Sequence, residues 1–280
     1  MRTIQLIAIA GLILASTVGE AVGEGTINER KPARRDGIVE VLNANGTVLI
    51  VGWDRDEVEV RASLGEGAER LAFSSDENRT TVEVVTPDAD QEIGNSHVRV
   101  RVPKESQVEA GTVNADIHVV RVQGLVFLQS VTGDIRVKDG PREVDAKSLR
   151  GEVEISVSRA RVKASSAGGR VTLRETTGEA DVSTVSGNVV VEGGTYERGR
   201  FKTISGDLRF GGGLEANGVF EFTSHGGTID LILPEAISAD ILLSTHSGEI
   251  ENEFEVKRGP GRRPRGMQGK RLAFSTTKGT

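Results

Sequence analysis

The sequence predicts an all-β protein, a parallel β-solenoid with two short strands in each coil of about 18 to 21 residues. The first observation is a repeat of that period, in which apolar and polar residues alternate on either side of a small turn residue. The second is composition, since 35 of the 280 residues are Gly and 36% are apolar, a balance that suits short strands and many turns. No Cys is present, so packing and hydrogen bonds alone must stabilise the fold.

The first 22 residues are expected to form a signal peptide. Arg2 supplies a short positive segment, and the stretch from Ile4 to Val18 is predominantly apolar. This stretch is shorter than the ~20 residues that a membrane-spanning helix needs, and it fits the apolar part of a secretory signal. We therefore expect an exported protein of the periplasm, cell surface or extracellular space, with an uncleaved membrane anchor as the alternative. Residues 23–35 are expected to be a short linker to a solenoid domain over 36–280.

Residues 36–107 are expected to form N-terminal strands that cap the solenoid. The repeat frame occurs here once, in the segment NANGTVLI (43–50), with Gly46 as its turn residue. An open solenoid end would pair with other chains, so a cap is needed to cover it. The further strand-like runs are Glu57–Ala62, Thr81–Thr86 and His97–Val102.

Residues 108–252 are expected to form the regular coils. Eight segments align on a small residue at the turn, with separations of 18, 18, 18, 18, 19, 21 and 21 residues. Glycine at a sharp turn suggests a backbone with positive φ. Positions two and four after this anchor, and five and seven before it, are mostly apolar, so both strands of a coil face one core. The anchors are Ala115, Gly133, Gly151, Gly169, Gly187, Gly206, Gly227 and Gly248.

A column of hydroxyl residues stands three positions before the anchor, where every coil has Ser or Thr. Such hydroxyls can satisfy backbone groups that a turn leaves unpaired, so we interpret the column as structural rather than catalytic. A left-handed hexapeptide helix also has coils of 18 residues, but it needs an apolar residue eight before the anchor. Five coils have a charged residue there, which excludes it, and the handedness of the coil stays open. These residues are Glu143, Arg161, Glu179, Arg198 and Asp240.

The C-terminal part departs from the repeat. Residues 253–271 form an insertion rich in Gly, Pro and Arg, and residues 272–280 re-enter the frame as a final partial coil. The functional interpretation of Arg262, Arg263 and Arg265 is contact with an anionic surface, and the alternative is a solvated loop.

The segment VEVLNANGTVLIVGWDRDEVEV (39–60), with Gly52, Trp53 and Asp54, and the serial S-x-S-G-[DN]-[IVL] units resemble a known bacterial family. It is the β-strand-repeat family labelled "putative adhesins", a cell-envelope domain of unknown function. The resemblance covers roughly residues 36–280. It implies a β-solenoid in the cell envelope or outside the cell, and it brings no catalytic residues.

Two patterns in the repeat were weighed as sites and declined. His225 and His246 stand two positions before the anchor in consecutive coils. A metal site needs three or four ligands, so no metal is expected. The preferred interpretation is a partly buried stack of these side chains. Six before the anchor, acidic and basic residues alternate, which favours a solvated charge ladder between coils. Its members are Asp145, Lys163, Asp181, Arg200 and Glu221.

Function follows mainly by exclusion. The net charge of −6 comes from 35 basic and 41 acidic residues spread along the chain, which argues against nucleic-acid binding. Tight coils leave little loop to shape a groove, and no carboxylate pair stands out as a catalytic acid and base, so neither enzyme activity nor a cofactor is expected. We expect a non-enzymatic, adhesin-like or scaffold protein whose partner is an envelope or extracellular polymer or protein. The alternatives are a membrane-anchored accessory protein of envelope-stress signalling and a β-helix enzyme acting on polysaccharides.

Overall fold

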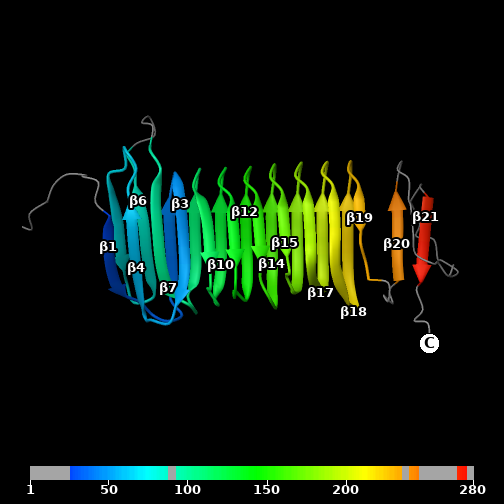
Figure 1. The fold of residues 1–280 in the computed structure, drawn as a ribbon, viewed down its shortest axis with the longest axis horizontal. Helices are drawn as coiled ribbons and strands as arrows, with labels where there is room; N and C mark the ends of the chain where they lie inside the picture. The colour runs from blue at the N-terminus through cyan, green and yellow to red at the C-terminus, as the bar shows by residue number, and fades with distance from the viewer. Residues whose placement is uncertain (1–25, 88–92, 235–239, 246–269, 276–280) are drawn as a thin grey trace, which may run out of the picture.

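The computed structural model describes residues 26–87, 93–234, 240–245 and 270–275. These residues form 21 strands that stand side by side along one long axis (Figure 1). No helix occurs among them, so none there is long and apolar enough to cross a membrane. Three sequence predictions lie outside the described residues: the signal peptide at 1–22, the anchor Gly248 and the arginines of the insertion, Arg262, Arg263 and Arg265.

Each regular coil contributes one strand to each of two sheets. Strands within a sheet run parallel, and equivalent residues of successive coils lie opposite one another, as Ile135 does with Ile117 and Val153. The predicted all-β parallel solenoid is therefore confirmed. The first sheet contains β8 (Gln107–Thr112), β10 (Leu125–Ser130), β12 (Glu143–Ser148), β14 (Ala160–Ser166) and β16 (Gly178–Thr184). The second contains β9 (Asp116–Val120), β11 (Ile135–Lys138), β13 (Val153–Ser156) and β15 (Val171–Arg174).

The later coils have longer strands that pass through both sheets. These are β17 (Val189–Thr203) and β18 (Leu208–Ser224); the start of β17 pairs with β15 and its end pairs with β16. Gly193 and Gly194 stand between the two halves with φ of +70° and +77°, a region in which glycine carries no Cβ penalty. β19 (Ile229–Leu231) then pairs with the start of β18 in the second sheet.

The N-terminal strands do more than cap the stack. β2 (Ile38–Asn43) lies between β6 (Arg79–Val85) and β8, and β3 (Gly46–Trp53) lies between β7 (Ser96–Pro103) and β9. The early copy of the repeat frame is thus a full coil of the solenoid. β6 and β7 still pair with it in parallel, and beyond them the pairing becomes antiparallel, which ends the parallel stack. The antiparallel strands are β1 (Ile27–Pro32), β4 (Glu57–Ser63) and β5 (Arg70–Ser75).

Strand β1 lies within the stretch 23–35 for which the sequence predicts a linker. Its sequence, INERKP, has no apolar alternation, and most of its side chains are exposed. The strand forms because its backbone pairs with β4, and Arg30 reaches the carboxylate of Glu59. Long-range pairing of this kind leaves no periodic pattern in the sequence.

The core lies between the two sheets and consists of the predicted apolar columns. Six residues of one column, from Ile117 to Leu208, are at most 1% exposed. Aromatic side chains fill the core of the later coils, where the ring centroids of Phe201 and Phe222 lie 5.3 Å apart and those of Phe201 and Phe210 lie 5.4 Å apart. Ala164 occupies the Phe201 column in an earlier coil, so larger side chains accompany the longer coils.

The turn anchors lie at close contacts between coils. Gly46 has a φ of +105°, as expected, but none of the other six described glycine anchors has a positive φ, so that explanation is wrong for them. A Cβ on Gly133 would lie 2.0 Å from the carbonyl oxygen of Ala115, and a Cβ on Gly151 would lie 2.1 Å from that of Gly133. Strands stack about 4.8 Å apart, which leaves no room for a side chain here. Steric exclusion, and not backbone dihedral, explains glycine at these positions.

The hydroxyl column has the structural role that the sequence predicts. The N–H of Gly169 donates to Ser166 Oγ at 2.9 Å, and that hydroxyl donates to the carbonyl oxygen of Gly151 at 2.9 Å. Ser148 makes the equivalent pair of bonds one coil earlier. At Ser148, Ser166, Thr203 and Ser224 the hydroxyl thus links its own turn to the previous one, and the structural interpretation is confirmed at these positions.

Strands β20 (Asp240–Thr245) and β21 (Lys270–Ser275) form a separate antiparallel pair. The sequence predicts instead that residues 272–280 begin another parallel coil. Antiparallel pairing needs only a reversal of chain direction, whereas a further coil needs the chain to complete a full turn before it pairs again.

Candidate functional site

The outer face of the first sheet is a ladder of matched charges. Arg161 pairs with Glu179 at 3.2 Å, and Arg200 bridges Asp181 at 3.4 Å and Glu221 at 3.3 Å in the coils on either side. The predicted solvated ladder is confirmed. Because its charges already compensate one another between coils, this face offers few free groups to a charged ligand.

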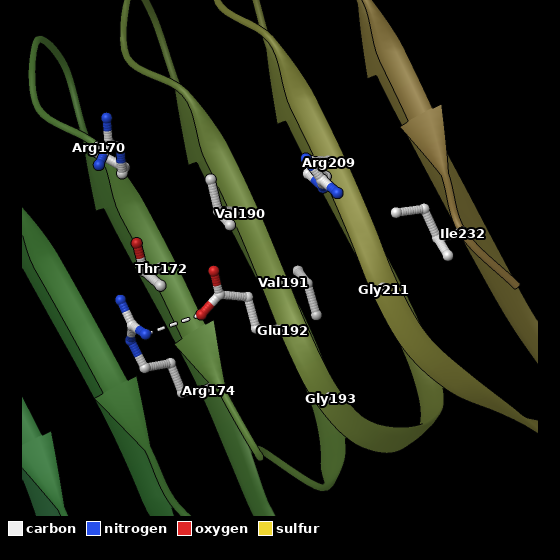
Figure 2. A pocket seen from close by; sticks show the side chains of 10 residues that line it. All are labelled: Arg170, Thr172, Arg174, Val190, Val191, Glu192, Gly193, Arg209, Gly211 and Ile232. Carbon is white, nitrogen blue, oxygen red and sulfur yellow. Dashed lines mark ion pairs between the residues drawn. The ribbon is translucent and has the colours of Figure 1, made fainter.

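The outer face of the second sheet is different, because it contains a shallow groove of about 670 Å³ (Figure 2). Three neighbouring coils form it, at β15, β17 and β18, and the residue after β19 borders it. The sequence predicts little loop to shape a groove, and this one lies on the strands themselves and not between long loops. The residues that line the groove are Arg170, Thr172, Arg174, Val190, Val191, Glu192, Gly193, Arg209, Gly211 and Ile232.

The groove is hollow because side chains are small or missing there, and not because long loops surround it. Arg174, Glu192 and Gly211 occupy the same column in three successive coils, so the side chain is absent in the third. Thr172 and Val190, two residues earlier on the same face, form the floor. A glycine thus removes what would otherwise be a continuous row of long polar side chains.

Arginine dominates the charge at this groove. Arg174 is held on both sides, by Glu192 at 2.8 Å and by Glu154 at 3.2 Å. Arg209 is more loosely held, 3.8 Å from Asp230, and its side chain is 63% exposed. Arg170 is exposed and forms no ion pair within the described part of the chain. The groove therefore has one held guanidinium and two that are available to a ligand.

Arg170 also interrupts a structural hydrogen-bond ladder. One position after the anchor, Asp116 Oδ1 accepts a hydrogen bond from the N–H of Asp134 at 2.9 Å, and Asp134 Oδ1 accepts one from Glu152 at 2.9 Å. Asn188 Oδ1 does the same further along, at 3.0 Å from the N–H of the next coil. A guanidinium has no hydrogen-bond acceptor, so Arg170 cannot accept a bond from the N–H of the next coil. Arg170 is thus an arginine in a column of residues that otherwise accept hydrogen bonds from the next turn. This exception is the sequence feature that could have pointed to the groove.

The structure does not place the two histidines of the repeat together within the described residues. His225 is exposed, His246 lies outside those residues, and no group of three potential metal ligands occurs among the described side chains. The expectation of a partly buried stack in this column is wrong as well, since Leu149 is 52% exposed and Ile204 is 53% exposed. The preceding hydroxyl points inward to its backbone partners, so the next side chain must point outward.

The Gly-Trp-Asp segment is part of the N-terminal packing. A Cβ on Gly52 would lie 2.0 Å from the carbonyl oxygen of Arg121, so this strand also needs glycine for close approach. The guanidinium of Arg55 lies 5.1 Å from the ring centroid of Trp53 and that of Arg101 lies 5.6 Å from it, within cation–π range. The hydrogen bond and charge of Lys104 lower the pKa of Asp54 below its ordinary value. The segment therefore has a structural explanation.

A buried carboxylate anchors the same region. Glu59 is 1% exposed and lies beside three guanidinium groups, Arg30, Arg61 at 3.2 Å and Arg101 at 3.2 Å. Burial alone would raise the pKa of Glu59, but the hydrogen bond and charge of Arg30, with the other two arginines, bring it below its ordinary value. This cluster links β1, β4 and β7. The carboxylate of Glu59 already pairs with three arginines, so it is not a candidate binding group for a ligand.

Comparisons with known proteins agree with this fold. A family model described as Toastrack DUF4097 matches residues 39–271. No curated protein matches the sequence. A solved structure named "putative adhesin", from Bacteroides fragilis, is 12% identical, with a TM-score of 0.50 over 75% of this chain and 98% of that one. A "putative lipid binding protein" from Parabacteroides distasonis is 11% identical, with a TM-score of 0.40 over 73% of this chain and 96% of that one. At these identities the resemblance shows the fold alone.

Proposed function

The chain belongs to the Toastrack DUF4097 family, and on that basis we propose that it is an exported, non-enzymatic binding protein of the cell envelope. It would act as an adhesin-like module or scaffold that presents one outer face of the solenoid to its partner. The partner is an envelope or extracellular polymer or protein. The rigid stack of coils supplies a long, straight surface for such contact.

The contrast between the two outer faces is the single observation that carries this proposal. Most charges of the first sheet are matched between coils, whereas the second sheet has a groove in which Arg170 forms no ion pair with the described residues. Binding and not catalysis is favoured because the groove contains a single carboxylate, Glu192, which is already held by Arg174. A hydrolase of the two-carboxylate type would need a second, opposed acid.

Export is supported by the apolar stretch Ile4–Val18 and by the small residues after it. If the segment is cleaved, the solenoid is released to the periplasm or beyond. An intact segment would hold the solenoid at the membrane, which is the arrangement expected of an accessory protein in envelope-stress signalling.

The experiment has two measurements on the full chain expressed in a bacterial host. Fractionation with N-terminal sequencing is expected to give soluble exported protein that begins near residue 23. The purified exported protein is then sedimented with isolated envelope and extracellular-polymer fractions, and it is expected to co-sediment in a saturable manner. Absence of saturable binding to every fraction contradicts the binding function. Recovery in the membrane with Met1 intact contradicts release and favours the signalling accessory.

A further inference from the structure

We propose that the groove on the second sheet binds a linear polysaccharide that carries carboxylates, with Arg170 and Arg209 as the residues that contact them. This inference rests on the proposed binding function and adds the chemical class of the ligand. Arg174 is not assigned a ligand contact, since two carboxylates already hold it at the edge of the groove.

The two available arginines suit an oxyanion. A guanidinium presents parallel N–H donors that match a carboxylate in a bidentate pair, and these charge-assisted bonds are stronger than neutral ones. Arg170 forms no ion pair within the described residues, and the 3.8 Å contact of Arg209 with Asp230 is loose and solvent-exposed. A ligand carboxylate can therefore bind Arg170 without displacing an internal partner and Arg209 at small cost.

The spacing of these arginines favours an extended ligand over a small anion. Arg170 precedes β15, and Arg209 lies on β18, two coils further along and in the column of Thr172. Their backbones are therefore separated by roughly 10 Å across the strands, at ~4.8 Å per strand, and by about 7 Å along them, at ~3.3 Å per residue. Figure 2 shows Arg170 and Arg209 on opposite sides of Val190. Two carboxylates on one linear molecule that lies across the strands fit this arrangement.

The remaining lining explains why the ligand is a polysaccharide and not a polyphosphate. Glu192 and Asp230 are each 53% exposed at or beside the groove, and they would repel most strongly a chain whose charges are closely spaced, as in polyphosphate. The net charge of −6 adds to this repulsion. A polysaccharide reduces this repulsion because a whole sugar ring separates its carboxylates. Its hydroxyls can donate to Glu192, and the C–H faces of its rings can pack on Val190 and Ile232.

The test is titration calorimetry of the purified exported protein with oligogalacturonate, neutral galacto-oligosaccharide and inorganic polyphosphate as probes. Arg170→Gln and Arg209→Gln are each expected to weaken oligogalacturonate binding about tenfold, and the double variant about a hundredfold, from the loss of one charge-assisted contact each. The matched control is Arg161→Gln on the opposite face, where the side chain is 66% exposed and makes one ion pair. It removes the same charge and is expected to leave the dissociation constant within about twofold.

Each other outcome overturns the inference. Equal weakening by Arg161→Gln means that binding follows net charge and not the groove. Equally tight binding of the neutral oligosaccharide or of polyphosphate means that the ligand class is wrong. Saturable binding to envelope fractions that oligogalacturonate does not displace refutes the ligand class alone, whereas absence of envelope binding refutes the proposed function. Unchanged thermal unfolding of all variants confirms that they are folded, as expected for exposed sites.

Discussion

Replacing the anchor Gly169 with alanine tests the close contact between coils. A Cβ there would lie 2.1 Å from the carbonyl oxygen of Gly151 and 2.8 Å from that of Arg150, so the two coils must separate. Overpacking of a tight interior costs about 2 kcal/mol. Separation also weakens the two hydrogen bonds of Ser166, which adds about 1 kcal/mol. We expect Gly169→Ala to lower the free energy of unfolding by about 3 kcal/mol.

The neighbouring residue provides a matched control. A Cβ on Gly168 would meet its nearest atom, the carbonyl oxygen of Leu149, at 3.7 Å, an ordinary contact. Gly168→Ala is therefore expected to change the unfolding free energy by less than about 0.5 kcal/mol. Equilibrium urea denaturation followed by far-UV circular dichroism measures both, because this signal reports all coils. Equal effects of the two substitutions, or a stable Gly169→Ala, would refute the steric explanation.

Three further predictions concern the hydroxyl column, the buried carboxylate and the exposed apolar column. Ser166→Ala should lower the free energy of unfolding in urea by about 1 to 3 kcal/mol, because two backbone groups lose their partner. The control Ser165→Ala changes a half-buried residue of the same strand and should have little effect. An unchanged free energy of unfolding for Ser166→Ala would contradict the structural role. The pKa of Glu59 is lower in the folded protein than its ordinary value of 4.5, so its contribution to stability is present above pH 4.5 and is lost as the pH falls through the folded value. Urea midpoints of wild type should therefore fall more steeply below pH 4.5 than those of Glu59→Gln, and parallel curves would exclude this role. Leu149→Ala should lower the free energy of unfolding by less than about 0.5 kcal/mol, since the side chain is 52% exposed. Leu128→Ala should lower it by about 2 to 5 kcal/mol, since that side chain is fully buried. Comparable losses in the same assay would mean that Leu149 does not point outward.

The repeat was readable from the sequence because its signal is local. Apolar residues such as Val137 and Ile155 recur at fixed offsets from the turn, and period-2 alternation specifies which side chains face the core. The charge ladder was readable for the same reason, since residues in one column of successive coils become neighbours. Lys163, for example, follows Asp145 by one coil and lies 3.9 Å from its carboxylate.

The candidate site was not readable in the same way. Arg170 and Arg209 occupy different columns of different coils, and no pattern in the sequence relates them. Only the stacked strands bring them to one groove, and only the absence of a side chain at Gly211 makes the surface hollow there. One sequence feature was relevant, namely an arginine in a column of hydrogen-bond acceptors. It could be interpreted only once the structure showed that this column accepts hydrogen bonds from the next turn.

The sequence by itself determined the strand content, the core columns and the parallel stacking, since each follows from the translation of one short unit. The tertiary structure alone decided that β2 and β3 are inserted between β6–β7 and β8–β9, and that antiparallel strands end the stack. It also decided why the anchors are glycine, through contacts such as Gly151 with Gly133. The physical reason is that these features depend on distances between backbones of different coils, and such distances are set by packing and not by local pattern.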